Sequence, residues 1–253
     1  MKITSARLCE AGRIELEQKE VAFGEHDALI EIIACGICRG DVRLFLNAAS
    51  DRFGHEPVGR VVAAGKRVTR VALGDIVTGT IYGSFATHVV AHENDLYSVP
   101  DSLGVNGCLT EPLKCVTTVI RAASPDFMDN VVVVGCGFMG LATIAGMARS
   151  WLRKLIAVDS VPLRLELARE LGATEVVEPY HARDMITRLA KDGANTTIEF
   201  AGTAEAAALA CQLTRKRGRV VLAGGMSPSG NVYGASLTVN FVPPAFSPDE
   251  SDD

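Results

Sequence analysis

A glycine-rich turn constrains this chain more than any other feature. The sequence Gly135-Cys136-Gly137-Phe138-Met139-Gly140 directly follows the apolar run 131–134 and opens a stretch with helical periodicity. Strand, glycine turn and helix in this order are typical of a dinucleotide-binding fold, because the glycines permit the turn, the approach of a pyrophosphate and close helix–strand packing. We therefore expect Gly135, Gly137, Phe138, Met139 and Gly140 to line a cofactor site.

An acidic residue at the end of the next apolar run narrows the choice of cofactor. Asp159 stands nineteen residues after Gly140. A carboxylate there would bind the adenine ribose hydroxyls and repel a 2'-phosphate, which predicts NAD rather than NADP. The nearest arginine downstream, Arg164, is expected well into the following helix. The alternative is a glycine-rich turn with an ordinary surface aspartate.

The second half of the chain alternates apolar runs of strand length with amphipathic helical stretches. This alternation predicts an α/β domain with a parallel sheet. The five predicted strands are 131–134, 155–159, 175–177, 197–200 and 219–223, and the predicted helices are 138–150, 162–171, 184–190 and 204–214.

The first half shows short β-rich runs broken by glycine, which predicts a compact, mostly β domain. Its predicted strands are 28–34, 59–64, 75–80 and 85–91. We place a mostly β domain at residues 1–122 and the nucleotide-binding domain at 123–240. Residues 241–253 are acidic and poor in apolar side chains, so a disordered tail is expected there.

Charge and composition argue against several partners. The net charge of −5 gives no basic field for nucleic acid. The sequence has no run approaching the roughly 20 apolar residues that span a bilayer, and the start resembles no signal peptide, so we expect no membrane partner and a cytoplasmic protein. The seven cysteines are then expected to be reduced thiols, with a metal ligand among them.

Thiol, imidazole and carboxylate side chains gather within about twenty residues of the first half. These residues are Cys35, Cys38, Asp41, His55 and Glu56. They are zinc ligand types, and a catalytic zinc needs three protein ligands with a fourth position left open. The spacing alone leaves alternatives open, since Cys35 and Cys38 could form a redox pair or be buried thiols, and His55 could be a structural loop residue.

The chain resembles the zinc-dependent medium-chain dehydrogenases, the superfamily of alcohol, sorbitol and threonine dehydrogenases, over residues 1 to about 240. The resemblance implies a GroES-like domain followed by a Rossmann domain. The motifs that carry it, besides the glycine loop, are Gly36-Ile37-Cys38-Arg39-Gly40-Asp41, Gly54-His55-Glu56-Pro57-Val58-Gly59-Arg60-Val61-Val62, Gly74-Asp75-Ile76-Val77, Gly83-Ser84-Phe85-Ala86 and Glu111-Pro112-Leu113.

The same resemblance implies roles for five residues. Cys38 and His55 match ligands of the catalytic zinc, and Glu56 matches a carboxylate that ligates or exchanges with water. Glu111 matches the acidic residue that sorbitol-type members place beside the metal. Asp41 matches a carboxylate that accepts a hydrogen bond from the His55 ring. Cys35 matches no ligand.

The implied reaction is reversible hydride transfer between an alcohol and NAD, with a small alcohol or ketone as substrate. The pair Glu111-Pro112 favours polyols, sugar-like or other secondary alcohols. One catalytic zinc is expected and no structural zinc, because the segment between Val77 and Phe85 is too short for a lobe with four cysteines.

Other departures from the family leave alternatives. Gly40 stands where a Ser or Thr usually starts proton relay, and Arg43 where a relay histidine is common. Typical members are longer, so the Rossmann sheet is expected to lack its last strand, which would weaken a homo-oligomer formed through that edge. The alternatives are a non-catalytic NAD-binding relic and a zinc-free quinone or enone reductase; the zinc-ligand set argues against the latter.

Overall fold

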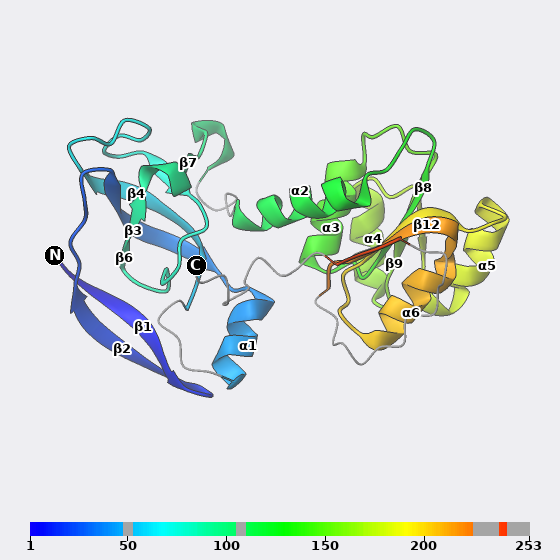
Figure 1. Cartoon of the computed structure of the whole chain (residues 1–253), viewed down its shortest axis with the longest axis horizontal. Helices are drawn as coiled ribbons and strands as arrows, with labels where there is room; N and C mark the ends of the chain where they lie inside the picture. Colours follow the sequence, from blue (N-terminus) through cyan, green and yellow to red (C-terminus); the bar gives the residue numbers. More distant parts are fainter. Residues whose placement is uncertain (48–52, 105–109, 225–237, 242–253) are drawn as a thin grey trace. The chain divides into compact units, whose positions relative to one another are not determined.

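The computed structural model describes residues 1–47, 53–104, 110–224 and 238–241 (Figure 1). The chain divides into two compact units, Met1–Leu113 and Lys114–Asp253. The division falls in the first turn of helix α2 (Glu111–Ala123), whereas the expected boundary at residue 122 lies at the other end of this helix. Each unit is described by itself.

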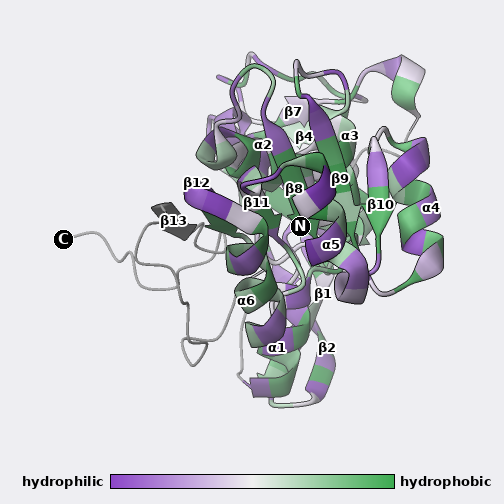
Figure 2. Cartoon of the chain, turned by 90° about the vertical axis from the view of Figure 1, so that its right-hand side faces the viewer, coloured by the Kyte–Doolittle hydropathy of each residue, from purple (hydrophilic) through white to green (hydrophobic). Residues whose placement is uncertain are grey.

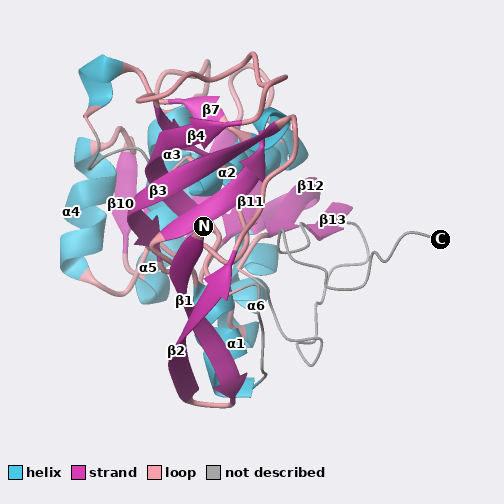
Figure 3. Cartoon of the chain, turned by 90° about the vertical axis from the view of Figure 1, so that its left-hand side faces the viewer, coloured by secondary structure: helices cyan, strands magenta, loops and turns pink. Residues whose placement is uncertain are grey.

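The first unit is mostly β, as predicted, and holds a five-stranded antiparallel sheet in the order β6-β3-β4-β5-β7. Strands β1 and β2 form a separate antiparallel ribbon (Figure 3). The elements are β1 (Lys2–Glu10), β2 (Arg13–Glu20), β3 (Asp27–Gly36), α1 (Arg39–Asn47), β4 (Glu56–Ala64), β5 (Ile76–Thr78), β6 (His88–His92), η1 (Glu93–Asp95), β7 (Tyr97–Ser98) and η2 (Asp101–Leu103). The β1–β2 ribbon escaped prediction because β2 is largely charged, and its two apolar residues, Ile14 and Leu16, are exposed.

The core of the first unit lies against one face of this sheet. Ile30 on β3 pairs with Val61 on β4 and with Val89 on β6, and all three are buried. Alternate side chains along a strand point to one face, so this register places the apolar residues of three strands together. Its consequence for the site is that β3 and β4 run together up to the pair Gly36 and Glu56.

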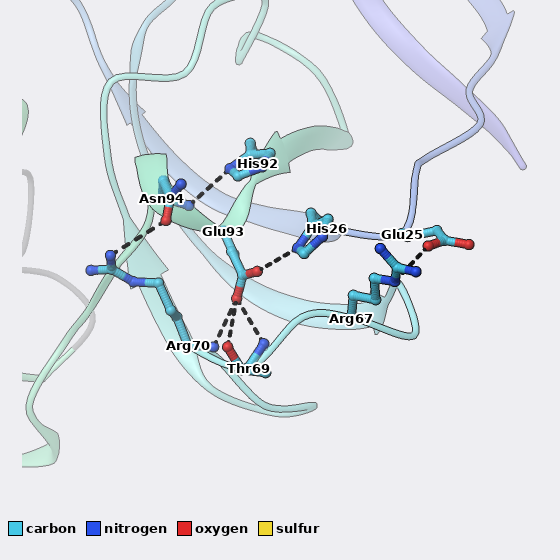
Figure 4. Close-up of polar contacts among 8 residues, drawn as sticks. All are labelled: Glu25, His26, Arg67, Thr69, Arg70, His92, Glu93 and Asn94. Carbon is cyan, nitrogen blue, oxygen red and sulfur yellow. Dashed lines mark hydrogen bonds and ion pairs between the residues drawn. The ribbon is translucent and has the colours of Figure 1, made fainter.

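The buried carboxylate of Glu93 connects two other segments of this unit, those around His26 and Thr69 (Figure 4). Glu93 Oε2 accepts the backbone N–H groups of Thr69 (2.7 Å) and Arg70 (3.0 Å), and Oε1 lies 2.9 Å from Nδ1 of His26. Backbone hydrogen bonds and His26 hold the pKa of Glu93 at about 2. The His26 ring stacks on that of His92, with ring centroids 5.9 Å apart, so both imidazoles belong to this contact network.

The second unit is a parallel sheet in the order β10-β9-β8-β11-β12-β13, and one helix follows each of β8, β9, β10 and β11 in the chain. The five predicted strands are all present, with β8 and β9 coloured as the hydrophobic centre in Figure 2. The elements are α2 (Glu111–Ala123), β8 (Asn130–Val134), α3 (Phe138–Met147), β9 (Lys154–Val158), α4 (Pro162–Glu170), β10 (Glu175–Val177), α5 (Pro179–Leu189), β11 (Ala194–Glu199), α6 (Ala204–Leu213), β12 (Thr214–Leu222) and β13 (Thr238–Phe241).

The expectation that this sheet lacks its last strand needs correction. A sixth strand, β13, pairs in parallel with β12, from Arg219 with Thr238 to Leu222 with Phe241. This four-residue strand was missed because it follows a stretch rich in Ser, Gly and Pro, where a short alternation is hard to recognise. The expected weakening of a homo-oligomer loses its support, and oligomerisation stays a prediction.

Two further expectations concern the C-terminal tail and membrane-spanning helices. The predicted acidic tail lies outside the described residues from 242 onward, and residue 241 ends β13. Among the described helices, none has the length and apolarity needed to cross a membrane.

Candidate functional site

The sheet register of the first unit brings three potential metal ligands together. Cys38 lies two residues beyond β3, His55 directly precedes β4, and Glu56 begins β4 opposite Gly36. One ligand atom from each of these residues lies within 4.8 Å of the other two. His55 is 3% and Glu56 8% exposed, and Cys38 is half-buried. The cluster joins one thiol, one imidazole and one carboxylate.

Asp41 organises this cluster from the first turn of α1. Its side chain is 1% exposed; Oδ2 accepts the Cys38 N–H (2.9 Å) and Oδ1 accepts the Gly54 N–H (3.1 Å). Oδ1 also lies 3.3 Å from Nδ1 of His55. With Nδ1 engaged, the other ring nitrogen of His55 is directed towards the cluster, where Nε2 lies 3.7 Å from Oε1 of Glu56. A carboxylate behind a histidine is the arrangement that fixes the tautomer of metal-binding imidazoles.

The donor atoms fit a zinc ion. Ligands at about 2.0 to 2.3 Å from a tetrahedral zinc lie roughly 3.3 to 3.8 Å from one another. The Nε2–Oε1 separation of 3.7 Å falls in this range. Gly40 adds a backbone N–H directed at Cys38 Sγ (3.4 Å), a donor that stabilises a thiolate. Cys38, His55 and Glu56 are therefore suited to hold zinc with one position left open.

The electrostatics of the cluster reflect crowded, buried charge. Burial alone would lower the pKa of His55, but the Asp41 carboxylate and Cys38 outweigh it and raise the pKa to about 10. The pKa of Asp41 is lowered against the opposing effect of burial, by His55 and by backbone donors. Burial, then the negative charges of Glu111 and Asp41, raise the pKa of Glu56 although His55 opposes them. A bound cation would offset this repulsion among carboxylates.

Glu111 influences the site through its charge and not as a member of the ligand cluster. It begins α2 and is 4% exposed. It is not among the three residues whose ligand atoms gather within 4.8 Å, yet its charge acts on Glu56. Its assignment as a metal ligand stays a prediction.

Cys35 does not join the ligand cluster. Its thiol donates to its neighbour's carbonyl, Gly36 O, at 3.5 Å, and burial raises its pKa to about 12. A neutral, half-buried thiol is a poor metal ligand and a poor nucleophile. Cys35 and Cys38 are both free thiols.

The turn that carries His55 is held by a second turn. Gly54 has φ of 82°, and a Cβ there would lie 2.7 Å from the backbone nitrogen of Phe85. Ser84 N–H donates to Gly54 O (3.2 Å), and Ile81 N–H donates to His55 O (3.3 Å). The sequence motifs around Gly54 and Ser84 thus pack on each other and fix the backbone of the histidine.

The glycine loop in the second unit has the shape of a pyrophosphate cradle. Gly135 has φ of 93°, and a Cβ at Gly140 would lie 2.0 Å from Gly135 O, so helix α3 can pack on β8 only without a side chain there. At Gly137, by contrast, a Cβ would meet nothing within 4 Å. Gly137 is the N-cap of α3 and makes no side-chain cap, so the N–H groups of this helix start are directed at an open space suited to phosphate. Phe138 is exposed and Met139 half-buried beside it.

Asp159 follows β9 beside this loop. Its Oδ2 accepts the Cys136 N–H (2.6 Å), and its Oδ1 accepts the Val161 N–H (2.9 Å). The expectation that Arg164 lies well into the following helix needs correction: Nη1 of Arg164 is 3.7 Å from Asp159 Oδ2. The helix α4 begins at Pro162, so Arg164 belongs to its first turn and its long side chain reaches back.

Two hydroxyl residues with no motif of their own, Thr78 and Thr110, contact each other through their side chains at 3.2 Å. The available signal is a hydroxyl residue ending the buried strand Ile76–Thr78, where an apolar residue would otherwise be expected.

Comparisons with known proteins match both halves of the chain to dehydrogenase families. The family described as alcohol dehydrogenase GroES-like domain matches residues 24–111, and the family described as zinc-binding dehydrogenase matches residues 134–241. An erythritol/L-threitol dehydrogenase from Mycolicibacterium smegmatis is 28% identical over 85% of this chain and 72% of its own length. A sorbitol dehydrogenase from Halalkalibacterium halodurans is 28% identical over 82% of this chain and 72% of its own length.

Solved structures show the same architecture. A structure from Sinorhizobium meliloti, described as a zinc-binding dehydrogenase bound to NADP, is 25% identical, covers 95% of this chain and 84% of its own, and has a TM-score of 0.83. A 2R,3R-butanediol dehydrogenase from Bacillus subtilis is 23% identical, covers 95% of this chain and 84% of its own, and has a TM-score of 0.76.

Proposed function

Because this chain belongs to the zinc-dependent medium-chain dehydrogenase superfamily, we propose that it transfers a hydride between a secondary alcohol of polyol or sugar-like kind and NAD. In this proposal Cys38, His55 and a carboxylate would hold one zinc ion. Glu56 is the carboxylate whose oxygen gathers with the Cys38 and His55 ligand atoms. The observation that carries the proposal is the convergence of these three ligand atoms within 4.8 Å. The polyol dehydrogenases among the relatives support the substrate class.

The chain's own residues prepare the reaction. Asp41 keeps Nδ1 of His55 engaged, so that Nε2 is presented to the metal. A zinc ion held by these residues would supply a Lewis acid that polarises the substrate oxygen. Gly40 has no hydroxyl group to take the substrate proton, so in this proposal the proton leaves to water.

The glycine loop provides for the cofactor. The open space at Gly137 and the N-terminus of α3 receive the pyrophosphate. Asp159 stands where the adenine ribose would bind, and its carboxylate supports NAD over NADP. Arg164 partly balances the negative charge of Asp159, which weakens the repulsion of a 2'-phosphate. An activity assay should therefore include both NAD and NADP.

The test is turnover by the zinc-loaded full chain. NADH or NADPH formation is followed with erythritol, threitol, sorbitol and a primary alcohol, each with NAD and with NADP, and Cys38→Ala serves as the control. The proposal expects NADH with at least one polyol, and none with Cys38→Ala. An inert protein that still binds NAD would favour the non-catalytic alternative, and turnover unaffected by Cys38→Ala would favour a zinc-free reductase.

A further inference from the structure

We propose that Thr78 is a positioning residue of the metal site, because its hydroxyl ties the segment that carries His55 and Glu56 to the segment that carries Glu111. The inference rests on the proposed function, since it concerns how the zinc ligands are held. Thr78 itself contacts no proposed ligand atom in the described contacts and is not offered as a catalytic residue.

One side of this tie reaches the strand of the ligands. Thr78 ends β5 and pairs with Val58 of the neighbouring strand β4. Its side chain is 1% exposed, and its Oγ1 donates to Pro57 O at 2.8 Å. Pro57 directly follows Glu56, so the hydrogen bond fixes the backbone one residue from the proposed ligand.

The other side reaches the start of helix α2. Thr110 Oγ1 lies 3.2 Å and Thr110 N 3.4 Å from Thr78 Oγ1. Because the proton of Thr78 is used on Pro57 O, its lone pairs accept both donors of Thr110. Thr110 directly precedes Glu111, so one buried hydroxyl connects two backbone positions that each adjoin a buried carboxylate.

This connection matters because it joins the segments of two buried carboxylates, Glu56 and Glu111, whose like charges oppose each other. Both are buried, and the charge of Glu111 acts on Glu56. The position of each carboxylate relative to His55 decides which of them can approach a metal. Without the Thr78 hydroxyl, the donors of Thr110 lose their acceptor at a partly buried position, and the start of α2 is free to shift.

The experiment compares zinc affinities of full-length Thr78→Val and Thr78→Ser with the wild type, by competition with a chelator of known affinity. Valine keeps the shape and removes the hydroxyl, whereas serine keeps the hydroxyl. Groups that orient metal ligands typically contribute about 10- to 100-fold to metal affinity. We expect Thr78→Val to bind zinc about 10- to 100-fold more weakly and Thr78→Ser to bind it within about threefold of the wild type.

A matched control separates positioning from general destabilisation. Thr197 is also a fully buried strand threonine, and its Oγ1 accepts the Thr214 hydroxyl at 2.7 Å in the second unit. Thr197→Val should lower the melting temperature without changing zinc affinity. Thr110→Val should also weaken zinc binding. In the double variant, the fold-loss of zinc affinity should be smaller than the product of the two single fold-losses, because both substitutions remove the same bridge.

The outcomes are distinct. Unchanged zinc affinity in Thr78→Val, or an equal loss in Thr197→Val, would overturn the positioning role while leaving the proposed function in place. A wild-type chain that binds no zinc would overturn the proposed function and the positioning role with it.

Discussion

Asp41 Oδ1 lies 3.3 Å from Nδ1 of His55, and both side chains are almost completely buried. The same carboxylate accepts the backbone N–H groups of Cys38 and Gly54. Asp41 therefore fixes both the ring of one proposed zinc ligand and the backbone of another.

Replacing Asp41 by Asn should weaken zinc binding without removing a ligand. The neutral amide supports the His55 ring less well and places an NH₂ group among the backbone donors. We expect zinc affinity to fall by about 10- to 100-fold, measured by chelator competition. An unchanged affinity would show that Asp41 does not orient His55 towards a metal.

Two glycines of the cofactor loop should respond differently to alanine. A Cβ at Gly137 would meet nothing within 4 Å and its φ is −71°, so Gly137→Ala should fold normally and obstruct only the bound pyrophosphate. We expect NAD affinity to fall at least about tenfold, equivalent to about 1.4 kcal/mol, in isothermal titration. A normal NAD affinity in this variant would contradict the placement of the phosphates.

Gly140→Ala is the contrasting case. Its Cβ would lie 2.0 Å from Gly135 O, so β8 and α3 must separate. We expect the free energy of unfolding to fall by about 1 to 3 kcal/mol in urea titration, even without cofactor. Stability equal to that of the wild type would contradict the close packing.

Arg164→Ala should sharpen the choice between cofactors. Nη1 of Arg164 lies 3.7 Å from Asp159 Oδ2 and balances part of its charge. Without the arginine, the carboxylate should repel a 2'-phosphate more strongly, so the ratio of NAD to NADP affinity should rise. A lower ratio in paired binding titrations would show that the pair does not act in this way.

Glu93→Gln should destabilise the first unit in a pH-dependent manner. The folded pKa of Glu93 is about 2, below its ordinary value of 4.5, so its charge contributes stability above pH 4.5 that is lost as the pH falls towards 2. We expect the variant to be less stable at pH 7 and the difference to shrink below pH 4.5. Urea unfolding at several pH values measures this, and a difference that grows on acidification would contradict the assignment.

The strand–turn–helix around Gly135 could be predicted because it is local: buried valines, glycine spacing and helix periodicity lie within twenty residues. The five predicted strands of the second unit were likewise marked by short runs rich in apolar residues. Strand β13 was not, because a four-residue strand in a Ser- and Gly-rich stretch gains its stability from pairing with β12 rather than from its own pattern.

The site could be predicted only in part. Residue types and motifs suggested Cys38, His55 and Glu56, but their approach depends on the register of β3 and β4, which no single segment encodes. Two side-chain contacts could not be predicted. The Thr78–Thr110 contact joins residues 32 positions apart in the chain. The contact of Arg164 with Asp159 is local but depends on the conformation of the arginine side chain.

The central claim is that Cys38, His55 and a carboxylate hold a single zinc ion, and the zinc content of the purified full-length chain tests it most directly. After loading and dialysis, elemental analysis should give one zinc per wild-type chain and close to none in Cys38→Ala and His55→Ala, with both variants folded by circular dichroism. A zinc-free wild type, or variants that retain a full equivalent of zinc, would contradict the account.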